Sequence, residues 1–229
     1  MKKKIVGLLG AGLLVCAFSL LSGPAQAALN FGGLVGWYSP SLGEVKDYLD
    51  VVNAFWDTDL KLEAGVMRGV AVEYELTPNF KLRGEWNGFN AETSDHDGYG
   101  WAGYKAEYKL NVNAYTLSGI CTMSPEQSLP HYIGAGLGQF RTKIQWDETI
   151  SIRGTPEWFT TGSQTEGPIG FHVFVGIRLG TGILLLRGEA RYILAKVKME
   201  DFEGLRGPVS GTTIDLGGLF LNVAVLAGF

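Results

Sequence analysis

The sequence has little of what several common protein classes need. Two cysteines in 229 residues exclude a disulfide scaffold, and a pI near 5.4 argues against a nucleic-acid binder, which would present a basic face. The 33 glycines follow no collagen-like period. Only 18% of the residues are charged and 46% are hydrophobic, a composition too apolar for a disordered chain. Length alone allows one β domain.

The first 27 residues are predicted to be a cleaved signal peptide. Lys2, Lys3 and Lys4 form a cationic start, residues 5–21 are apolar, and residues 25–27 read Ala-Gln-Ala, a small-x-small cleavage site. The mature domain is expected to span residues 28–229. Beyond the signal peptide no segment approaches the roughly 20 apolar residues that a membrane helix needs. A soluble exported protein and a membrane β-barrel are the two alternatives.

Alternation of polar and apolar residues predicts β-strands. From Tyr104 to Ala114 every even position is apolar or aromatic, while the odd positions are all polar. Residues 80–88 and 184–194 repeat this pattern. Weaker strand candidates are residues 29–38, 60–76, 132–144, 170–179 and 212–229. The total is eight strands, each with one apolar and one polar face.

Connection lengths distinguish a membrane barrel from a soluble sandwich. The links after the second, fourth and sixth strands are short: residues 77–79, 124–130 and 180–182. The links after the odd-numbered strands are longer and strongly acidic: residues 39–59, 91–99, 145–167 and 199–211. Short turns on one rim and long loops on the other are typical of outer-membrane barrels. We therefore predict an all-β, eight-stranded, antiparallel, up-and-down transmembrane β-barrel. A hairpin around residues 154–156 would give ten strands instead.

Aromatic residues near the strand ends are expected to form girdles at the two membrane surfaces. The candidates are Trp37, Tyr38, Trp86, Trp101, Tyr104, Trp146 and Tyr192.

The last strand carries the most specific motif. Leu219, Leu221, Val223, Val225, Ala227 and Phe229 share one face, and the chain stops at the aromatic residue. This ending resembles the recognition signal that the barrel-assembly machinery reads in bacterial outer-membrane proteins. Together with the signal peptide and eight strands, the mature chain resembles the small outer-membrane β-barrel superfamily of OmpA-type and opacity-type barrels.

Three further stretches also resemble sequences of that superfamily: residues 36–42, 74–79 and 132–138. The resemblance implies a bacterial outer-membrane location, contact with lipid and lipopolysaccharide, periplasmic termini and external loops. Arg68 departs from it, because it lies on the otherwise apolar face of the second strand, where a mid-membrane Arg would cost about 2 to 4 kcal/mol. Either a bulge at Gly65 or Gly69 redirects it or the register differs there. We expect no peptidoglycan-binding domain after the barrel, so the OmpA-type resemblance is to the membrane half only.

Charged residues on the polar faces are expected to fill the lumen, because an eight-stranded barrel is just wide enough for its own side chains. The predicted network of ion pairs contains Lys81, Arg83, Glu85, Lys105, Glu107, Lys109, Arg178, Arg187, Glu189 and Arg191. A narrow channel for small solutes, selective for anions, is the alternative. Gly103, Gly134, Gly136 and Gly138 are read as room for twist or for bulky neighbours rather than as a phosphate loop.

The first long link contains a helix pattern. Ser41 and Glu44 read as a capping box, and apolar residues follow at helical spacing to Phe55. Such a helix would either cover the barrel mouth or lie on the outer leaflet. Residues 95–98, Asp-His-Asp-Gly, resemble a fragment of a calcium loop but lack the distant bidentate Glu, so a solvated turn is the expectation.

Some small outer-membrane barrels are enzymes, so the residues that could serve catalysis in this chain are relevant. The three histidines are His96 in a link, His131 at the short-turn rim and His172, which is expected to face the lumen. No strand presents Ser and His together on the outer wall, so an enzyme acting on lipid A is the least favoured function. We expect a non-enzymatic structural or surface-interaction protein that needs no metal, cofactor or nucleic acid.

Overall fold

A computed structural model describes residues 29–99, 101–123, 129–180, 183–199, 203–204, 207–208 and 212–228. The predicted signal peptide, residues 1–27, and the terminal Phe229 lie outside the described residues, as does most of the predicted link 199–211. Among the described residues, no helix has both the length and the apolar character needed to span a bilayer.

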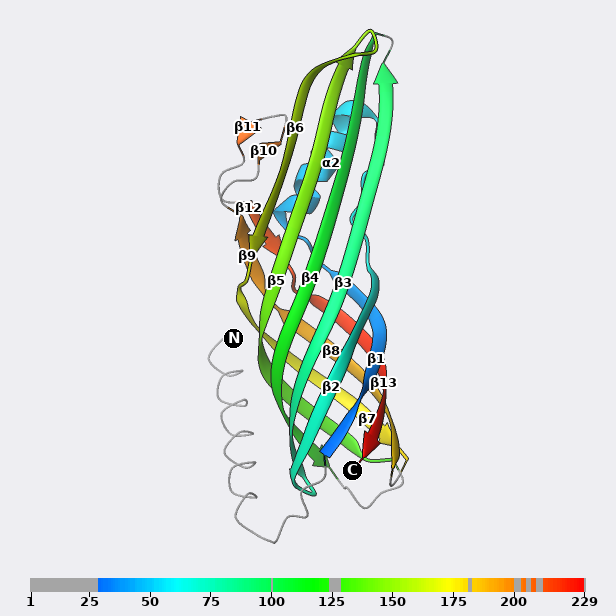
Figure 1. The fold of residues 1–229 in the computed structure, drawn as a ribbon, viewed down its shortest axis with the longest axis vertical. Coiled ribbons are helices and arrows are strands. Elements are labelled where there is room, and N and C mark those ends of the chain that lie inside the picture. Colours follow the sequence, from blue (N-terminus) through cyan, green and yellow to red (C-terminus); the bar gives the residue numbers. More distant parts are fainter. Residues whose placement is uncertain are drawn as a thin grey trace.

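The chain forms one helix and a succession of antiparallel strands (Figure 1). In chain order these are β1 (Leu29–Pro40), α2 (Glu44–Trp56), β2 (Gly65–Thr77), β3 (Phe80–Tyr99), β4 (Ala102–Met123), β5 (His131–Ile152), β6 (Thr155–Glu166), β7 (Ile169–Leu179), β8 (Leu184–Leu194), β9 (Lys196–Met199), β10 (Glu203–Gly204), β11 (Gly207–Pro208), β12 (Thr212–Asp215) and β13 (Gly218–Gly228).

Eight strands close into a ring, in the order β1, β2, β3, β4, β5, β7, β8 and β13. β13 pairs with β1 from Asn30–Gly228 to Pro40–Gly218, which closes the sheet. The predicted eight-stranded barrel is confirmed. A hairpin does turn at Gly154, but it adds no strand to the ring, because β6 pairs with the upper part of β5 and β7 with the lower part.

The strands are staggered around the ring. One row of paired residues starts at Leu29 on β1 and returns to that strand at Ser39, ten residues higher. It passes through Tyr74, Leu82, Gly119, Ala135, Val173, Tyr192 and Leu219. This stagger tilts every strand and fixes the relative heights of residues on different strands.

Three strands run far beyond the ring. β3, β4 and β5 have 20, 22 and 22 residues, whereas about 9–11 residues of a tilted strand suffice to cross a bilayer. Figure 1 shows them rising together with β6 into a tall curved sheet, with α2 on its concave side. We call the part above the ring the extension. The predicted links 91–99 and 145–167 are therefore mostly strand, and residues 95–98 lie in β3 rather than in a turn.

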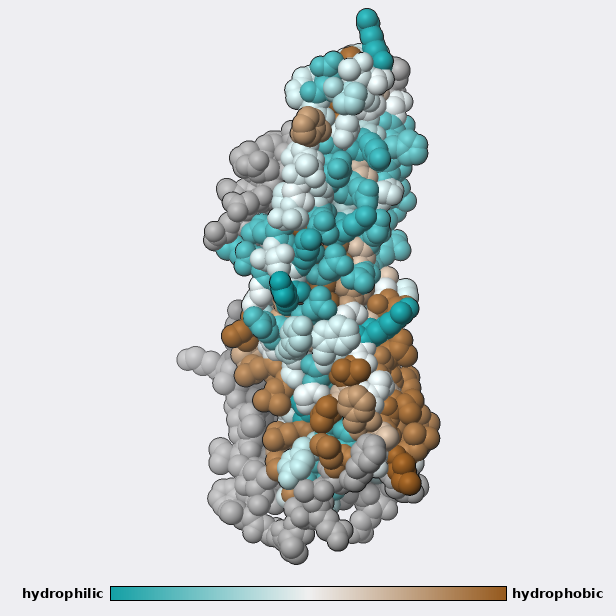
Figure 2. Space-filling model, viewed as in Figure 1, coloured by the Kyte–Doolittle hydropathy of each residue, from teal (hydrophilic) through white to brown (hydrophobic). Residues whose placement is uncertain are grey.

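The polarity of the two sheet faces inverts along β4. Facing outward, Leu117 and Tyr115 are 63% and 53% exposed, and the next outward residues up the strand are Asn113 and Asn111. Facing inward, Ser118 and Thr116 are buried, and the inward residues above them are Ala114, Val112, Leu110 and Tyr108. Figure 2 shows the result as a brown apolar band on the lower half and teal polar residues above it.

For this reason the prediction that Lys105, Glu107 and Lys109 face the lumen is wrong. Lys105, Glu107 and Lys109 lie on the outer face of the extension, where Lys109 pairs with Glu107 and, at 3.2 Å, with Glu92. Above the membrane, water is outside the sheet and the apolar face turns inward. The alternation has the same period in both regions, so it cannot reveal which face meets water.

The predicted aromatic girdles are also corrected in part. Trp37, Trp86 and Tyr192 face outward from the band, and Tyr115 stands beside Trp86 on the neighbouring strand. Tyr38 instead points inward and is fully buried. The other three candidates, Trp101, Tyr104 and Trp146, lie in the extension, above the band.

Two local expectations also change. Helix α2 begins at Glu44 after Gly43, which has φ 54° and no side-chain cap, so the predicted capping box is absent. Ser41 instead donates to the Asp215 carbonyl oxygen at 3.3 Å, and Glu44 accepts from the Thr213 amide at 2.5 Å. Arg68 faces outward without a bulge, since the only register shift of β2 against β3 lies at residues 75–77.

Candidate functional site

The lumen of the ring holds a cluster of buried charges. Its members come from strands on opposite sides of the barrel, β2 and β3 on one side and β7 and β8 on the other. They are Glu73, Arg83, Glu85, Arg178, Arg187, Glu189 and Arg191, each at most 9% exposed. We call this set the lumen network.

Glu73 joins three arginines across the barrel. Its Oε1 lies 2.9 Å from Nε of Arg83 and 2.6 Å from Nη1 of Arg187. Its Oε2 accepts from Nη2 of Arg178. The sequence interpretation missed Glu73 although it lies on the inward register of β2, two residues from the buried Ala71. The alternation of Val70, Val72 and Tyr74 was the signal that could have found it.

Glu189 is the second centre of the network. Its Oε2 lies 2.6 Å from Nη1 of Arg83 and accepts from the Tyr132 hydroxyl at 3.0 Å. Its Oε1 lies 2.7 Å from Nη2 of Arg191 and 3.5 Å from Nδ2 of Asn222. The carboxylate thus accepts hydrogen bonds from four residues, which offsets the cost of burying its charge.

Glu85 connects the two centres. It lies 3.0 Å from Nη2 of Arg187 and 2.5 Å from Nη2 of Arg191. Lys81 does not reach these carboxylates and pairs instead with the partly buried Glu75. The predicted lumen residues outside the extension are therefore all brought inside the ring, where their opposite charges pair.

An apolar layer lies directly above the lumen network. The ring of Tyr38 packs edge-on against Phe89 and Phe220, with centroid distances of 5.1 and 6.4 Å. The guanidinium of Arg191 lies 5.2 Å from the centre of the Phe174 ring and 5.8 Å from that of Phe220. Cation–π contacts of this kind join the charged layer to the apolar one. Tyr38, Phe89 and Phe220 are each at most 1% exposed.

His172 lies in the lumen, as the sequence indicated. Its Nε2 is 2.8 Å from the Ser118 hydroxyl, and its ring stacks on Phe174. Gly136 leaves the space for that ring, because a Cβ there would come within 2.7 Å of it, and Gly134 makes the same room for Phe174. The expectation that these glycines accommodate bulky neighbours is confirmed. Ser118 and His172 are 2% and 1% exposed, so this pair is part of the packing.

The extension has a core of its own. Val45, Leu49 and Val52 of α2 are buried against the inward faces of the tall strands. In the same core Glu148 is fully buried and accepts from the hydroxyls of Tyr48, at 2.8 Å, and Tyr108. These bonds tie the helix to β4 and β5.

The core of the extension also raises the pKa of a third tyrosine, Tyr104. Trp56 of α2 stacks on Tyr104 with ring centroids 5.1 Å apart. Burial, reinforced by the negative charge of Glu148, raises the pKa of Tyr104 far above its ordinary value.

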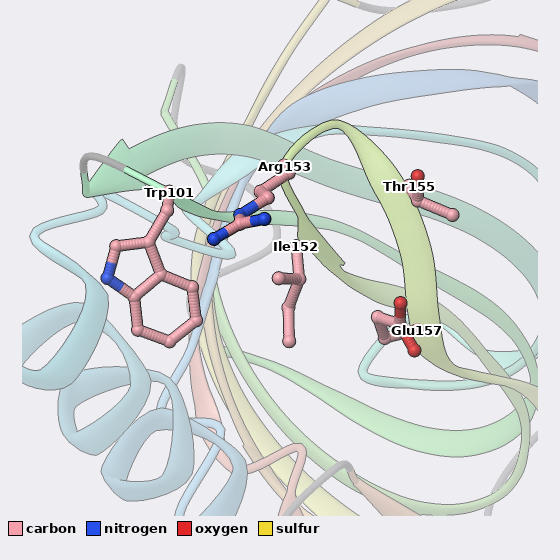
Figure 3. A pocket seen from close by; sticks show the side chains of 5 residues that line it. All are labelled: Trp101, Ile152, Arg153, Thr155 and Glu157. Atoms are coloured by element: carbon pink, nitrogen blue, oxygen red, sulfur yellow. The ribbon is translucent and has the colours of Figure 1, made fainter.

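A shallow open cleft occupies the tip of the extension (Figure 3). Trp101, Ile152, Arg153, Thr155 and Glu157 line it, and Figure 3 shows the Arg153 guanidinium beside the indole of Trp101. Lower on β3, Asp95 accepts from the backbone amides of Asp59 and His96. These two bonds lower the pKa of Asp95. In the part of the chain that the structure describes, no three His, Cys, Asp or Glu residues group closely enough to hold a metal ion.

Comparisons with known proteins identify the fold. No protein-family model and no curated protein matches the sequence. The outer membrane protein OprG from Pseudomonas aeruginosa superposes with a TM-score of 0.54 at 10% identity, over 90% of this chain and 98% of that one. Neisserial surface protein A gives a TM-score of 0.49 at 13% identity, over 91% and 100% of the two chains. The likeness to OprG shows that the chain has the eight-stranded fold of an outer-membrane barrel.

Proposed function

We propose that this protein is a non-enzymatic outer-membrane β-barrel of the bacterial envelope, with a structural or surface-interaction role. Its lumen is closed by its own side chains, and the extension is the part that meets external partners. The short turns and both ends of the described barrel lie on one rim, which faces the periplasm in barrels of this kind. The extension then projects outward, in contact with lipopolysaccharide.

One observation carries this proposal: the lumen network lies sealed beneath an apolar layer. Arg83, Arg187 and Glu189 pair with partners across the ring and are at most 5% exposed. A permeation pathway needs polar groups that meet water, whereas these groups meet each other. Immediately above them stand Tyr38 and Phe220, both with no exposed surface.

A narrow channel is the second candidate. Among the described residues, five lumen atoms have no hydrogen-bond partner: Arg83 Nη2, Asn87 Oδ1, His172 Nδ1, Arg187 Nε and Asn222 Oδ1. Buried polar atoms of this kind are ordinarily satisfied by water. A connected file of water past the arginines would favour anions.

Single-channel recording in planar bilayers tests the proposal. The refolded, heat-modifiable protein is expected to give no steady conductance steps. Steps that shrink in Arg187→Gln or Arg191→Gln, both kept heat-modifiable, would establish the channel instead. His131→Gln, at the short-turn rim, is the matched control that leaves any conductance unchanged.

The absence of catalysis is tested separately. Mass spectrometry of lipid A from cells with and without the protein is expected to give identical spectra. A new mass that disappears in His96→Ala would overturn the non-enzymatic assignment.

Assembly through the barrel machinery is the remaining part of the proposal. Leu221, Val223 and Val225 face outward from β13 and are about half exposed, as an assembly signal read from the outside requires. Deleting Phe229 is expected to lower the amount of folded protein in the outer membrane. Substituting Leu219 by Val, which keeps an apolar outward face, serves as the control.

A further inference from the structure

We infer that a basic patch on the outer wall binds the phosphate groups of the outer-leaflet glycolipid. The patch comprises Arg141 and Lys143 on β5 and Lys196 and Lys198 on β9, all facing outward. The inference rests on the proposed function, because it takes the extension as the external side.

The height of the patch is set by the apolar band. Leu137, Ile169 and Leu194 are the uppermost apolar outward residues of β5, β7 and β8 and are 51%, 75% and 53% exposed. Arg141 follows Leu137 by two outward positions, and Lys196 follows Leu194 by one. The patch thus begins where the hydrocarbon ends, at the level of lipid headgroups.

The four cations are also close together around the wall. Gln139 pairs with Ile169, and Phe171 pairs with Leu194. Continuing this register places Lys196 beside Ile169, two strands from β5. With strands about 4.8 Å apart and about 3.3 Å per residue, the Cα atoms of Arg141 and Lys196 lie about 12 Å apart. Side chains of this length can converge on one phosphate-bearing headgroup.

A hollow in the wall lies within the patch. β6 and β7 are separated at Gly167 and Pro168, and the gap beside β9 forms a cleft of about 470 Å³. Lys196 and Lys198 line the cleft, together with Glu166. A headgroup seated there would meet both lysines.

The positive charge of the patch is only partly balanced. Asp215 lies 3.9 Å from Lys196 but also accepts from the Gly217 amide at 2.8 Å, and Glu166 accepts from Gln164 at 3.2 Å. Among the residues whose side chains the structure describes, two carboxylates thus face four cations, on a chain whose formal net charge is −4. A local positive surface on an acidic protein, at headgroup height, favours an anionic lipid. Arg141 can bind phosphate with two hydrogen bonds, and the lysines act as point charges.

Native mass spectrometry of the full protein tests the inference. The protein is refolded in phosphatidylcholine nanodiscs and offered bisphosphorylated lipid A or lipid A stripped of phosphate. The triple variant Arg141→Gln/Lys143→Gln/Lys198→Gln removes three cations of the patch. Lys46→Gln/Lys105→Gln/Lys109→Gln removes three cations of the extension elsewhere, and is its matched control.

The wild type and the control are expected to retain phosphorylated lipid A in preference to the stripped form. The patch variant should lose between about tenfold and a hundredfold of this retention, since each cation near an anionic surface contributes roughly a factor of five. Equal losses in both variants would overturn the inference, as would equal retention of both lipids by the wild type. Displacement by millimolar inorganic phosphate would also overturn it, because the site would then bind free phosphate.

The heat-modifiable mobility of each protein on a gel distinguishes failure of the patch inference from failure of the proposed function. A wild type that inserts as a folded barrel but shows no lipid preference contradicts the patch alone. A wild type that remains dissolved without a bilayer contradicts the proposed function, and the patch inference with it.

Discussion

The ring and the extension share strands but bury opposite kinds of side chains. In the ring the inward faces of β3 and β8 carry Arg83, Glu85 and Glu189, while the outward faces are apolar. In the extension the inward faces carry Tyr108 and Leu110, and the outward faces are polar. The same β4 contributes to both. The solvent outside the sheet, hydrocarbon below and water above, decides which side chains turn inward.

The difference also shows how each half is stabilised. In the ring the outer face is lined by exposed apolar side chains that lie against lipid, and the inner face buries an apolar layer around Tyr38 and Phe220 above the lumen network. Its interior is specified by ion pairs across the barrel. The extension has an ordinary apolar core between α2 and the sheet, in which tyrosines hold the buried carboxylate of Glu148.

Replacing Glu189 by Leu should have the largest effect. The change leaves two carboxylates, Glu73 and Glu85, to balance the four arginines of the lumen network. It is expected to lower the free energy of unfolding by about 3 to 5 kcal/mol. Urea unfolding in detergent micelles measures it. Glu107→Gln, in a half-exposed pair of the extension, is the control and should leave the midpoint unchanged. Equal midpoints for both variants would contradict the importance of the lumen network.

A charge placed on the outer face should distinguish the two halves of β4. Leu117→Lys puts an ammonium group against lipid and is expected to cost about 2 to 4 kcal/mol if it lies near the midplane. Asn111→Lys, six residues higher on the same face, is expected to cost nothing measurable. Unfolding midpoints in lipid vesicles compare the two. A similar loss of unfolding free energy at both positions would show that the lipid-facing apolar band of β4 extends up to Asn111.

Truncating the helix core should affect the extension alone. Leu49→Ala removes a buried side chain that is 2% exposed and should destabilise the docking of α2 by roughly 2 kcal/mol. Hydrogen exchange is expected to rise in α2 and the upper part of β4, and to stay unchanged in β8 and β13. Val51→Ala, on the exposed side of the helix, is the control. Faster exchange throughout the ring would contradict the independence of the two cores.

The smallest expected effect is a loosening of the extension in alkali. The pKa of Tyr104 is raised above the unfolded value of about 10, so its contribution to stability is complete below pH 10 and is lost as the pH rises beyond it. Tyrosinate absorbance and near-ultraviolet circular dichroism follow the change. Tyr104→Phe should reduce the amplitude of this late step. Titration of all nine tyrosines near pH 10 with no late step would contradict the burial of Tyr104.

The sequence predicts the ring well because its determinants are local. Turn residues such as Thr77-Pro78-Asn79 and the alternation on β8 define strand ends and faces. The same reasoning placed Arg83, Arg187 and Glu189 inside correctly. The helix was also predicted within a few residues, although its capping box was not formed.

The extension could not be predicted by alternation, because Lys105 and Lys109 alternate with apolar residues just as lumen residues do. Acidic residues such as Asp95 and Asp147 made strand segments look like loops. Strand length carried the missing information, since the alternation from Tyr104 continues well beyond one bilayer crossing. The partners of Glu73 and Glu189 lie across the ring, more than a hundred residues away in the sequence for some pairs.

Quenching of a fluorophore along the outer face of β4 tests the inversion most directly. Single cysteines at positions 117, 115, 111 and 109, in a Cys121→Ala background, are labelled and reconstituted with brominated lipid. The account predicts strong quenching by lipid at 117 and 115, and quenching only by aqueous iodide at 111 and 109. Lipid quenching that continues to position 109, or aqueous quenching at all four positions, would contradict it.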